Sequence, residues 1–320
     1  MIDKTPKVRV IFMGTPPMAA DILSGLVEKK YAIVSVVTKP DSTDGREQKT
    51  IESAVKQKAL AYGLSVEQPK KFDREMVEKI KGLKPDLIIV VAYGKILPPE
   101  ILRIPGLGCI NVHASLLPKW RGASPIQNAL LSGETETGVT IMLMDEGMDT
   151  GDILAQKKIS IDSNETKNDL ISRLTKEGKN LLLKTVPLLV ERKISPSPQD
   201  DSRSTLCQLV EREDGHIIWT DDAESIYNRY RALFLWPGIF SFWKKDDNLL
   251  RLKLHRISCQ KHSPQTPHQI GEVFELGEKV GVQTGSGVIF LEEVQLEGKN
   301  KLPIKEFLLG NKEIIGSFLC

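Results

Sequence analysis

An almost unbroken apolar run, Asp86-Leu-Ile-Ile-Val-Val-Ala92, is the feature that most restricts how this chain can fold. A run of this length without polar alternation is typical of a strand that helices cover on both faces, as in parallel sheets. Strand-like and helical stretches alternate around it, which favours a doubly wound α/β sheet. Further strands are expected at 8–13, 33–38, 109–112, 138–144 and, as an edge strand, 153–161, and helices at 18–29, 51–62, 73–81, 125–131 and 166–193, with a kink or break at Pro187.

The composition changes at a Ser- and Pro-rich stretch, and the pattern of elements changes with it. Residues 194–207 have the composition of a linker. Beyond it come short β-like runs with Gly-rich turns, among them 238–243 and 288–296, which favour a small barrel of the oligonucleotide/oligosaccharide-binding (OB) type. The sequence therefore predicts a Rossmann-like, mainly parallel α/β domain over 1–193, a linker over 194–207 and an OB-like β-barrel over 208–320.

The overall composition excludes several classes of protein. The chain has 320 residues and a formal net charge of only +2, which argues against nucleic-acid binding through bulk charge. The four cysteines form no CxxC pair, so neither a zinc site nor a disulfide framework is indicated. The apolar runs are too short to span a bilayer, and the N-terminus has no signal-peptide core. We therefore expect a cytoplasmic protein without a membrane segment and without a metal.

The stretch Cys109-Ile-Asn-Val-His-Ala-Ser-Leu-Leu-Pro-Lys-Trp-Arg-Gly122 shows the clearest sign of a site. Asn111 and His113 lie two apart on the expected strand, so both side chains point to one face. His113 falls at the strand's C-terminal end, where open α/β sheets form their ligand crevice. A polar pair beside the apolar loop that follows suits a flat, partly polar ligand. The alternative is a buried histidine bonded to a carbonyl, which is the more common state of a lone histidine.

A short acidic loop, Asp145-Glu-Gly-Met-Asp-Thr-Gly-Asp152, follows the next expected strand. It offers a carboxylate that could act together with His113. Spacing alone does not separate Asp149 from Asp145 or Asp152, and each of them could instead cap a turn.

Two polar stretches are candidates for a macromolecular partner. The long polar loop at 39–50 is one, because long loops inside compact domains are usually functional or disordered. The other is the run at 244–261, which holds six basic and two acidic residues. The ordinary interpretation of such a run is a solvated face of the barrel.

Several motifs occur together along almost the whole chain. They are Phe12-Met-Gly-Thr-Pro16, Val90-Val-Ala-Tyr-Gly94, 108–127, 136–152, Trp236-Pro-Gly238, Thr284-Gly-Ser-Gly287 and 305–310. In combination they resemble the bacterial methionyl-tRNA formyltransferases, within the superfamily that uses 10-formyltetrahydrofolate. The resemblance implies an enzyme that moves the formyl group of 10-formyltetrahydrofolate to the α-amine of methionyl initiator tRNA, giving N-formylmethionyl-tRNA for translation initiation. It also implies a monomer and a C-terminal barrel that binds tRNA.

By this resemblance the catalytic residues are Asn111, His113 and Asp149. Transfer builds negative charge on the formyl oxygen, and the Asn111 amide and His113 would donate hydrogen bonds to it. Both ring states of a histidine are accessible near neutral pH. Asp149 would orient His113 and help to move a proton through water.

The resemblance also implies binding residues. The loop that binds the folate is matched by Ser115, Leu116, Leu117 and Pro118. The loop at 39–50 matches an insertion that grips the tRNA acceptor stem, with Arg46 at its key arginine and Lys49 beyond. The chain departs from the family by having Glu47 and Gln48 directly after that arginine, which dilutes the local positive charge. Arg212 lies near a position close to the linker that is often basic.

Two other functions stay open at this point. An N-formyltransferase acting on a sugar nucleotide would fit the N-terminal half equally well, but the loop at 39–50 and the barrel with its Trp236-Pro-Gly238 fit it less well. A folate- or RNA-binding module without activity is the third possibility, although a binding module has no need of Asn111, His113 and Asp149 together.

Overall fold

The computed structural model describes residues 8–44, 49–262 and 268–320. Contacts divide the chain into two compact units. The N-terminal unit comprises Met1–Pro125, Glu136–Ile161 and Leu170–Gln208, and the C-terminal unit comprises Ile126–Thr135, Asp162–Asp169 and Leu209–Cys320. Two short segments from earlier in the chain, Ile126–Thr135 and Asp162–Asp169, therefore belong to the C-terminal unit. The sequence of these segments does not predict the unit to which they belong, because the grouping depends on contacts with residues far along the chain.

A seven-stranded sheet organises the N-terminal unit, in the order β5-β2-β1-β6-β7-β9-β10. Its strands are β1 (Arg9–Gly14), β2 (Ala32–Val37), β5 (Val66–Glu67), β6 (Leu87–Val91), β7 (Cys109–His113), β9 (Glu136–Leu143) and β10 (Ile153–Ser160). Neighbours from β5 to β7 are parallel, whereas β9 is antiparallel to β7 and β10 is antiparallel to β9. The mainly parallel, doubly wound sheet is confirmed, and β10 is its edge.

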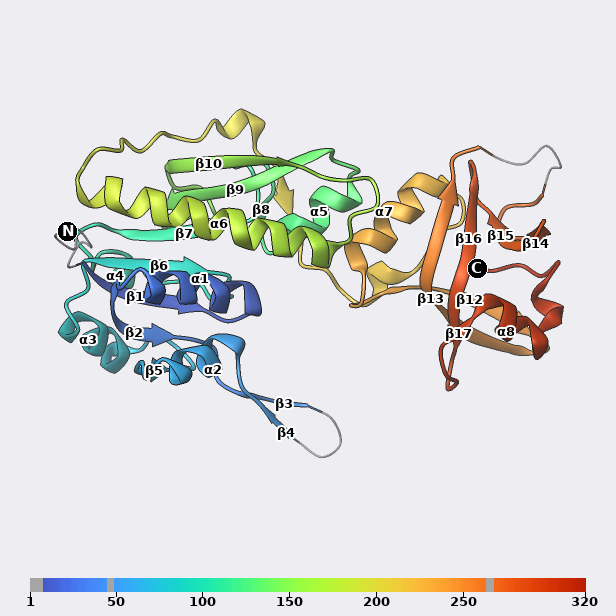
Figure 1. The fold of residues 1–320 in the computed structure, drawn as a ribbon, viewed down its shortest axis with the longest axis horizontal. Coiled ribbons are helices and arrows are strands. Elements are labelled where there is room, and N and C mark those ends of the chain that lie inside the picture. The colour runs from blue at the N-terminus through green and yellow to red at the C-terminus, as the bar shows by residue number, and fades with distance from the viewer. Residues whose placement is uncertain (1–7, 45–48, 263–267) are drawn as a thin grey trace. The chain divides into compact units, whose positions relative to one another are not determined.

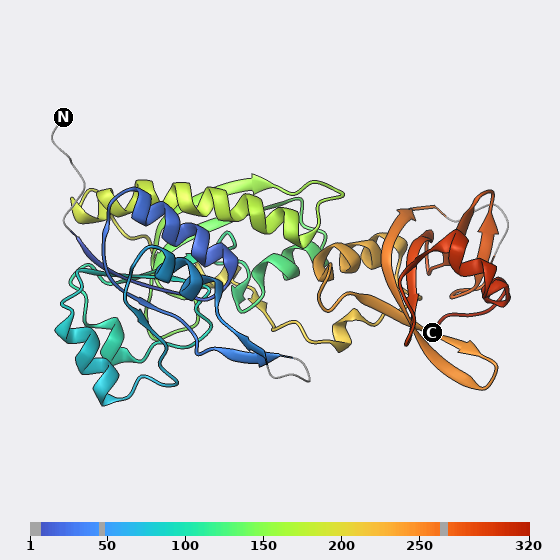
Figure 2. The same ribbon diagram turned by 60° about the horizontal axis from the view of Figure 1, so that its bottom comes forward.

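Helices cover both faces of this sheet (Figures 1 and 2). They are α1 (Pro17–Glu28), α2 (Ala54–Ala61), α3 (Arg74–Gly82), α4 (Pro99–Leu102) and α6 (Lys167–Val190). Ile80 of α3 and Ile101 of α4 share a buried cluster with Ile88 of β6. On the opposite face, a Cβ at Gly178 of α6 would lie only 3.2 Å from Val112 of β7, so α6 packs closely there. All five residues of β6 are buried as a result. No helix in the described part of the chain is long and apolar enough to cross a membrane.

Of the kink or break expected at Pro187, the break is wrong. Helix α6 runs through this proline and ends at Val190. A proline removes its own N–H bond and crowds the preceding turn. Because Pro187 lies in the last turn, only the end of the helix has to accommodate that loss.

The described residues of the polar stretch at 39–50 include two short strands. Strands β3 (Ser42–Asp44) and β4 (Lys49–Ile51) pair antiparallel, with Thr43 opposite Thr50. Threonine is β-branched and suits an extended backbone, which explains strands in a polar stretch.

A barrel-like sheet forms most of the C-terminal unit, in the order β12-β13-β16-β15-β14 with β17 beside β16, and every pair is antiparallel. The last residues of the chain close it. Phe242 of β12 and Cys320 exchange backbone hydrogen bonds of 2.8 and 2.9 Å, and Val273 of β14 donates to Ser317 at 2.9 Å. The expected small barrel is thereby confirmed. Its elements are β12 (Ile239–Lys245), β13 (Asn248–Gln260), β14 (Val273–Leu276), β15 (Lys279–Gln283), β16 (Val288–Leu296), β17 (Leu302–Pro303) and α8 (Ile304–Leu309), with α7 (Ala223–Leu233) before them and α5 (Pro125–Leu131) from earlier in the chain.

Residues 194–207, expected as a linker, lie against the N-terminal unit, and we call them the strap. Strand β11 (Leu206–Cys207) pairs in parallel with β8 (Arg121–Gly122). Ser197 and Ile153 exchange backbone hydrogen bonds of 2.8 and 2.9 Å. The Ser- and Pro-rich composition suggests a free connection, but these backbone bonds hold the strap in place. The division into domains at 193 and 208 stays a prediction.

Candidate active site

Strand β7 places Asn111 and His113 on one face of the sheet. They alternate with Val112, which packs towards α6 on the opposite face. His113 is the last residue of the strand and only 5% exposed, whereas Asn111 is half-buried. The period of two along a strand therefore produces the expected polar pair.

The loop between β9 and β10 brings Asp149 to this pair. Asn111 Nδ2 donates to Asp149 Oδ1 at 3.3 Å, and His113 Nδ1 lies 3.5 Å from Asp149 Oδ2. The same Oδ2 accepts a hydrogen bond of 2.9 Å from the backbone N–H of Gly122. The Asp149 side chain is 16% exposed, so a substrate group or water can reach it.

The backbone of this loop is tight. Asp149 has a φ of 55°, in the left-handed region that few residues other than glycine adopt. A Cβ at Gly151 would lie 1.9 Å from the carbonyl oxygen of Leu143, so only glycine fits there. Asp145 caps the loop, since its Oδ1 accepts hydrogen bonds from Gly147 N and Thr150 Oγ1 at 3.0 and 2.7 Å. The turn-capping alternative thus applies to Asp145, while Asp149 faces the polar pair.

Both ring nitrogens of His113 have a polar neighbour. Nε2 lies 2.9 Å from the carbonyl oxygen of Trp120. A carbonyl only accepts, so Nε2 carries a proton and donates it. Nε2 therefore makes the carbonyl bond of the alternative interpretation, whereas Nδ1 faces the Asp149 carboxylate. A separation of 3.5 Å leaves that contact weak enough for a third polar group to share it.

The segment after His113, expected to bind the folate, is held rigidly. Thr140 Oγ1 donates to the carbonyl of Ser115 at 2.7 Å and accepts from the N–H of Leu117 at 3.1 Å. The side chains of Ser115 and Leu117 are buried, whereas Leu116 and Pro118 are half-buried. Only the latter two side chains, together with backbone groups, are placed to contact a ligand.

The strap supplies contacts that the sequence analysis missed. Its Gln199 donates a hydrogen bond of 2.8 Å to the backbone carbonyl of Asp149. Its Thr205 accepts one of 2.9 Å from the N–H of Trp120, whose carbonyl holds His113. No signal in the sequence could have found these residues, because the composition of the strap predicts a linker.

Two buried cysteines near the site are poor nucleophiles. Cys109 begins β7, and burial raises the pKa of its thiol to about 12. Cys207 lies on β11 beside Gly122, and burial again raises its thiol pKa. A thiol attacks as the thiolate, so neither residue supports covalent catalysis at neutral pH.

The residues expected to bind tRNA come from two parts of the chain. Arg46 lies outside the described residues, and Lys49 is the first residue of β4. Arg212 is exposed and belongs to the C-terminal unit, directly before a 3₁₀ turn (Glu213–Gly215). Arg212 is thus in a different unit from Asn111, His113 and Asp149.

The basic run at 244–261 covers the end of β12 and all of β13. Its positive charge is partly neutralised by ion pairs. These are Lys245 with Glu313 at 2.7 Å, Arg256 with Glu292 at 3.0 Å and Lys261 with Glu224 at 2.9 Å. The pairs favour the ordinary interpretation, a solvated face, for this part of the barrel.

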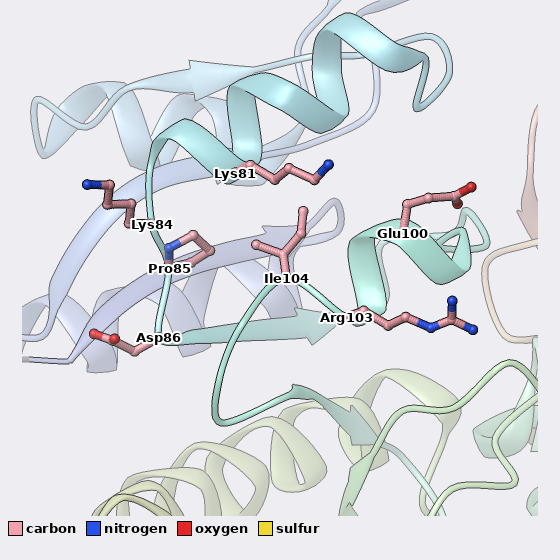
Figure 3. A pocket seen from close by; sticks show the side chains of 7 residues that line it. All are labelled: Lys81, Lys84, Pro85, Asp86, Glu100, Arg103 and Ile104. Atoms are coloured by element: carbon pink, nitrogen blue, oxygen red, sulfur yellow. The ribbon is translucent and has the colours of Figure 1, made fainter.

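A separate hollow of about 650 Å³ lies at the amino end of β6. Figure 3 shows Lys84 and Asp86 pointing to one side and Lys81, Glu100 and Arg103 to the other. The charged ends therefore do not converge on one ligand, and Arg103 already pairs with Glu146 at 2.8 Å. We assign no ligand to this hollow. Its lining residues are Lys81, Lys84, Pro85, Asp86, Glu100, Arg103 and Ile104.

No cluster of three or more His, Cys, Asp or Glu side chains within 8–44, 49–262 and 268–320 is arranged to hold a metal ion. Asn111, His113 and Asp149 include only two groups of that kind. A reaction without a metal stays a prediction.

Comparison with known proteins places the chain in a family. Residues 7–186 match the family described as Formyl transferase, and residues 209–312 match Formyl transferase, C-terminal domain. A protein of Citrifermentans bemidjiense named methionyl-tRNA formyltransferase is 41% identical over 314 residues, which cover 98% of this chain and 96% of that protein. A protein of the same name from Caldicellulosiruptor saccharolyticus is 43% identical over 314 residues, covering 97% and 99%.

Solved structures share the fold at low sequence identity. The N-formyltransferase of Helicobacter canadensis, solved with folinic acid and dTDP-3-aminofucose, superposes with a TM-score of 0.65 and 19% identity, covering 89% of this chain and 98% of that chain. At this identity the likeness concerns the fold alone. The full-length relatives and the two matched domains carry the assignment, and by them this chain belongs to the methionyl-tRNA formyltransferase family of formyl transferases.

Proposed function

We propose that the protein transfers the formyl group of 10-formyltetrahydrofolate to the α-amine of methionyl initiator tRNA, giving N-formylmethionyl-tRNA for translation initiation. The observation that carries the proposal is the sequence identity of 41%, over 98% of the chain, to a relative named methionyl-tRNA formyltransferase. It extends through both units, so it includes the barrel as well as the catalytic half.

Asn111 acts as a hydrogen-bond donor in this proposal. His113 does so when its ring is protonated, because Nε2–H is already bound to the Trp120 carbonyl and the second donor is then Nδ1–H. When the amine attacks the formyl carbon, negative charge develops on the formyl oxygen. Preorganised donors stabilise such charge, and losing one typically costs ~10²–10³ in turnover. The Asn111 amide carries two N–H groups, and its contact with Asp149 uses one of them.

Asp149 and His113 move the protons. One proton leaves the attacking amine, and one reaches the folate nitrogen as its bond to the formyl carbon breaks and the tetrahedral intermediate collapses. The attacking amine must lose a proton, and a partly exposed carboxylate can accept it directly or through one water. The Trp120 carbonyl holds Nε2–H of His113, so the ring presents Nδ1 to the carboxylate and to the reacting groups. The bound donor supplies a formyl group that is already activated, so no residue of the chain has to form a covalent bond with it.

The loop of Ser115, Leu116, Leu117 and Pro118 is the proposed contact for the folate. Flat ligands bind where apolar side chains lie beside a few fixed polar groups. Half-buried Leu116 and Pro118 supply the apolar surface, and Thr140 fixes the backbone between them. These features fit a pterin ring.

The proposed tRNA contacts are Arg46, Lys49 and Arg212. A cation can reach a phosphate or a base edge. Lys49 stands in the β3–β4 hairpin, with Arg46 between its two strands in the sequence. Arg46→Ala is expected to weaken productive use of tRNA, which the turnover-to-affinity ratio for tRNA would measure.

We propose that three regions of the chain have separate roles. Residues 1–193 form the catalytic domain, 194–207 connect it to the barrel, and 208–320 bind tRNA. The matches to residues 7–186 and 209–312 support these boundaries. The enzyme works as a monomer in the cytoplasm, where its tRNA substrate is charged.

The test is formyl transfer from 10-formyltetrahydrofolate to purified initiator Met-tRNA. Elongator Met-tRNA and dTDP-3-aminofucose serve as parallel acceptors. Transfer to the initiator alone is the expected result. Transfer to the amino sugar but to neither tRNA would replace the proposal with a sugar N-formyltransferase, and folate binding without any transfer would leave a binding module.

A further inference from the structure

We propose that Gln199 is a positioning residue, which acts from the strap by holding Asp149 in the orientation that transfer needs. The inference rests on the proposed function and deepens it. It assigns a catalytic purpose to a segment whose composition suggests only a connection between domains.

The Gln199 amide bridges two peptide groups of the acidic loop. Its Nε2 donates to the carbonyl of Asp149 at 2.8 Å and to that of Gly151 at 2.7 Å. These carbonyls lie on either side of Thr150. Neither peptide plane can turn without breaking one of the bonds, so the direction of the Asp149 side chain is set.

The loop needs such a hold. A left-handed backbone at a residue other than glycine is costly and persists only where its surroundings impose it. Asp149 has this conformation, with a φ of 55°. Its carboxylate is oriented by Asn111 and Gly122, but these contacts leave its own carbonyl unconstrained. Gln199 supplies that missing constraint.

The other end of the Gln199 amide is anchored by a buried cation. Its Oε1 accepts hydrogen bonds from Arg121 Nε at 3.0 Å and Nη2 at 2.8 Å. Arg121 is only 6% exposed and also pairs with Asp201 at 2.7 Å. A cation on the amide oxygen polarises the amide and strengthens its N–H donors. Gly122, the residue after Arg121, donates to the Asp149 carboxylate. Residues 121–122 therefore hold the side chain of Asp149 directly and its backbone carbonyl through Gln199.

A positioning role and a merely structural role make different predictions. Groups held by positioning residues react more slowly when they are displaced by about 1 Å, and the cost reaches ~10²-fold. Substrate affinity is then largely kept, so kcat falls while KM changes little. A merely structural residue would lower stability and the folded fraction without this split.

The experiment compares Gln199→Met and Gln199→Glu with the wild-type protein. Methionine keeps the size but makes none of the bonds. Glutamate keeps an acceptor for Arg121 but cannot donate to the carbonyls. We expect kcat to fall ~10- to 100-fold in both variants, with KM for tRNA and for the formyl donor within ~3-fold of wild type. A wild-type kcat in Gln199→Glu would overturn the proposal. If Gln199→Met does not fold, the result for Gln199→Glu alone decides between a positioning role and a structural role.

A matched control comes from the C-terminal unit. Gln283 also donates to two backbone carbonyls, those of Thr284 and Gly287, at 2.9 and 3.1 Å, and is buried. Gln283→Met should lower the melting temperature yet leave kcat at saturating tRNA unchanged, because this side chain is buried inside the barrel and is not among the proposed tRNA contacts. An equal fall of kcat in both methionine variants would attribute the effect to general damage and reject the positioning role.

Two further readouts separate this inference from the proposed function. In an Asp149→Asn background, Gln199→Met should add little to the loss of kcat, because residues that act as a unit are not additive. A full additional loss would overturn the inference. Hydrogen exchange of residues 145–152 should speed up in Gln199→Met whatever reaction the enzyme catalyses, and unchanged exchange would also overturn it.

Discussion

The site in the N-terminal unit and the barrel of the C-terminal unit are built from different kinds of contact. In the barrel, β12 and β13, β14 and β15, β15 and β16, and β16 and β17 are paired strands that follow one another in sequence, and the pair β13–β16 is the exception. At the site, the partners are distant in sequence. Asn111 and Asp149 are 38 positions apart, Gln199 and Asp149 are 50 apart, and Arg121 and Asp201 are 80 apart.

The forces differ as well. The barrel encloses apolar side chains such as Trp243, which is 1% exposed. The site is held by hydrogen bonds between polar groups, each worth only about 1 kcal/mol net. Breaking the barrel should therefore cost stability first, and disturbing the site should cost activity first. Four sets of substitutions test that contrast, in order of expected effect.

Trp243→Ala should give the largest change, on the stability side. Removing a buried aromatic typically costs about 3–5 kcal/mol. Denaturant unfolding measures it. Trp236→Ala is the control, because this tryptophan of the same unit is 55% exposed and its loss should change stability by about 0.5 kcal/mol or less. Equal losses in the two variants would contradict a barrel stabilised by its core.

Asn111→Ala, His113→Ala and Asp149→Ala should give the opposite result. Each is expected to lower kcat by ~10²–10³, because each removes a group that faces the reacting atoms. Melting temperatures should stay near the wild-type value. Turnover near the wild-type level in His113→Ala would reject the proposed site, and a collapse of stability in all three would remove the contrast with the barrel.

Gly151→Ala tests the loop itself. The new Cβ would clash with the carbonyl of Leu143, so the loop must shift and carry Asp149 with it. We expect kcat to fall ~10- to 100-fold. Gly106→Ala is the matched change, since a Cβ there has no heavy atom within 4 Å and its kcat should not change. Steady-state kinetics of the pair would show whether loop geometry matters.

Asp222→Ala should give the smallest effect, together with a pH dependence. Asp222 caps α7, and the hydrogen bond from the Ser225 N–H lowers its pKa below the ordinary 3.8. A lowered carboxyl pKa adds stability that is present above the unfolded-state pKa and is lost as the pH falls through the folded-state value. The variant should lose about 1 kcal/mol at pH 7.

Unfolding free energies measured from pH 7 down to about 2 test this sign. The gap between wild type and Asp222→Ala should be constant above about pH 4 and narrow below it. Asp222→Asn, which keeps a good cap, should stay close to wild type at pH 7. A gap that widened in acid would contradict the assigned role.

Much of the fold could be predicted because it depends on local patterns. The apolar run around Ile88 indicates a strand buried on both faces, and the sheet confirms it. The period of two along β7 places Asn111 and His113 on one face. The pairing of β3 with β4 was not predicted, because Thr43 and Thr50 are the only β-branched residues in a polar stretch of turn formers before Ile51.

The choice among the three aspartates could not be made from spacing. Asp145 and Asp149 stand in one short loop, and their different partners depend on how the loop folds between β9 and β10. The family resemblance pointed to Asp149, and the geometry places that carboxylate beside Asn111 and His113. The catalytic role of Asp149 is tested by the Asp149→Ala variant.

By itself the sequence determined the strands, most helices and the face on which the polar pair stands, because these follow from the spacing of apolar residues over a few positions. Only the tertiary structure decided that the strap lies beside the site and that Gln199 reaches Asp149. The physical reason is that Ser- and Pro-rich segments carry no periodic pattern, and their place depends on hydrogen-bond partners presented by distant parts of the chain.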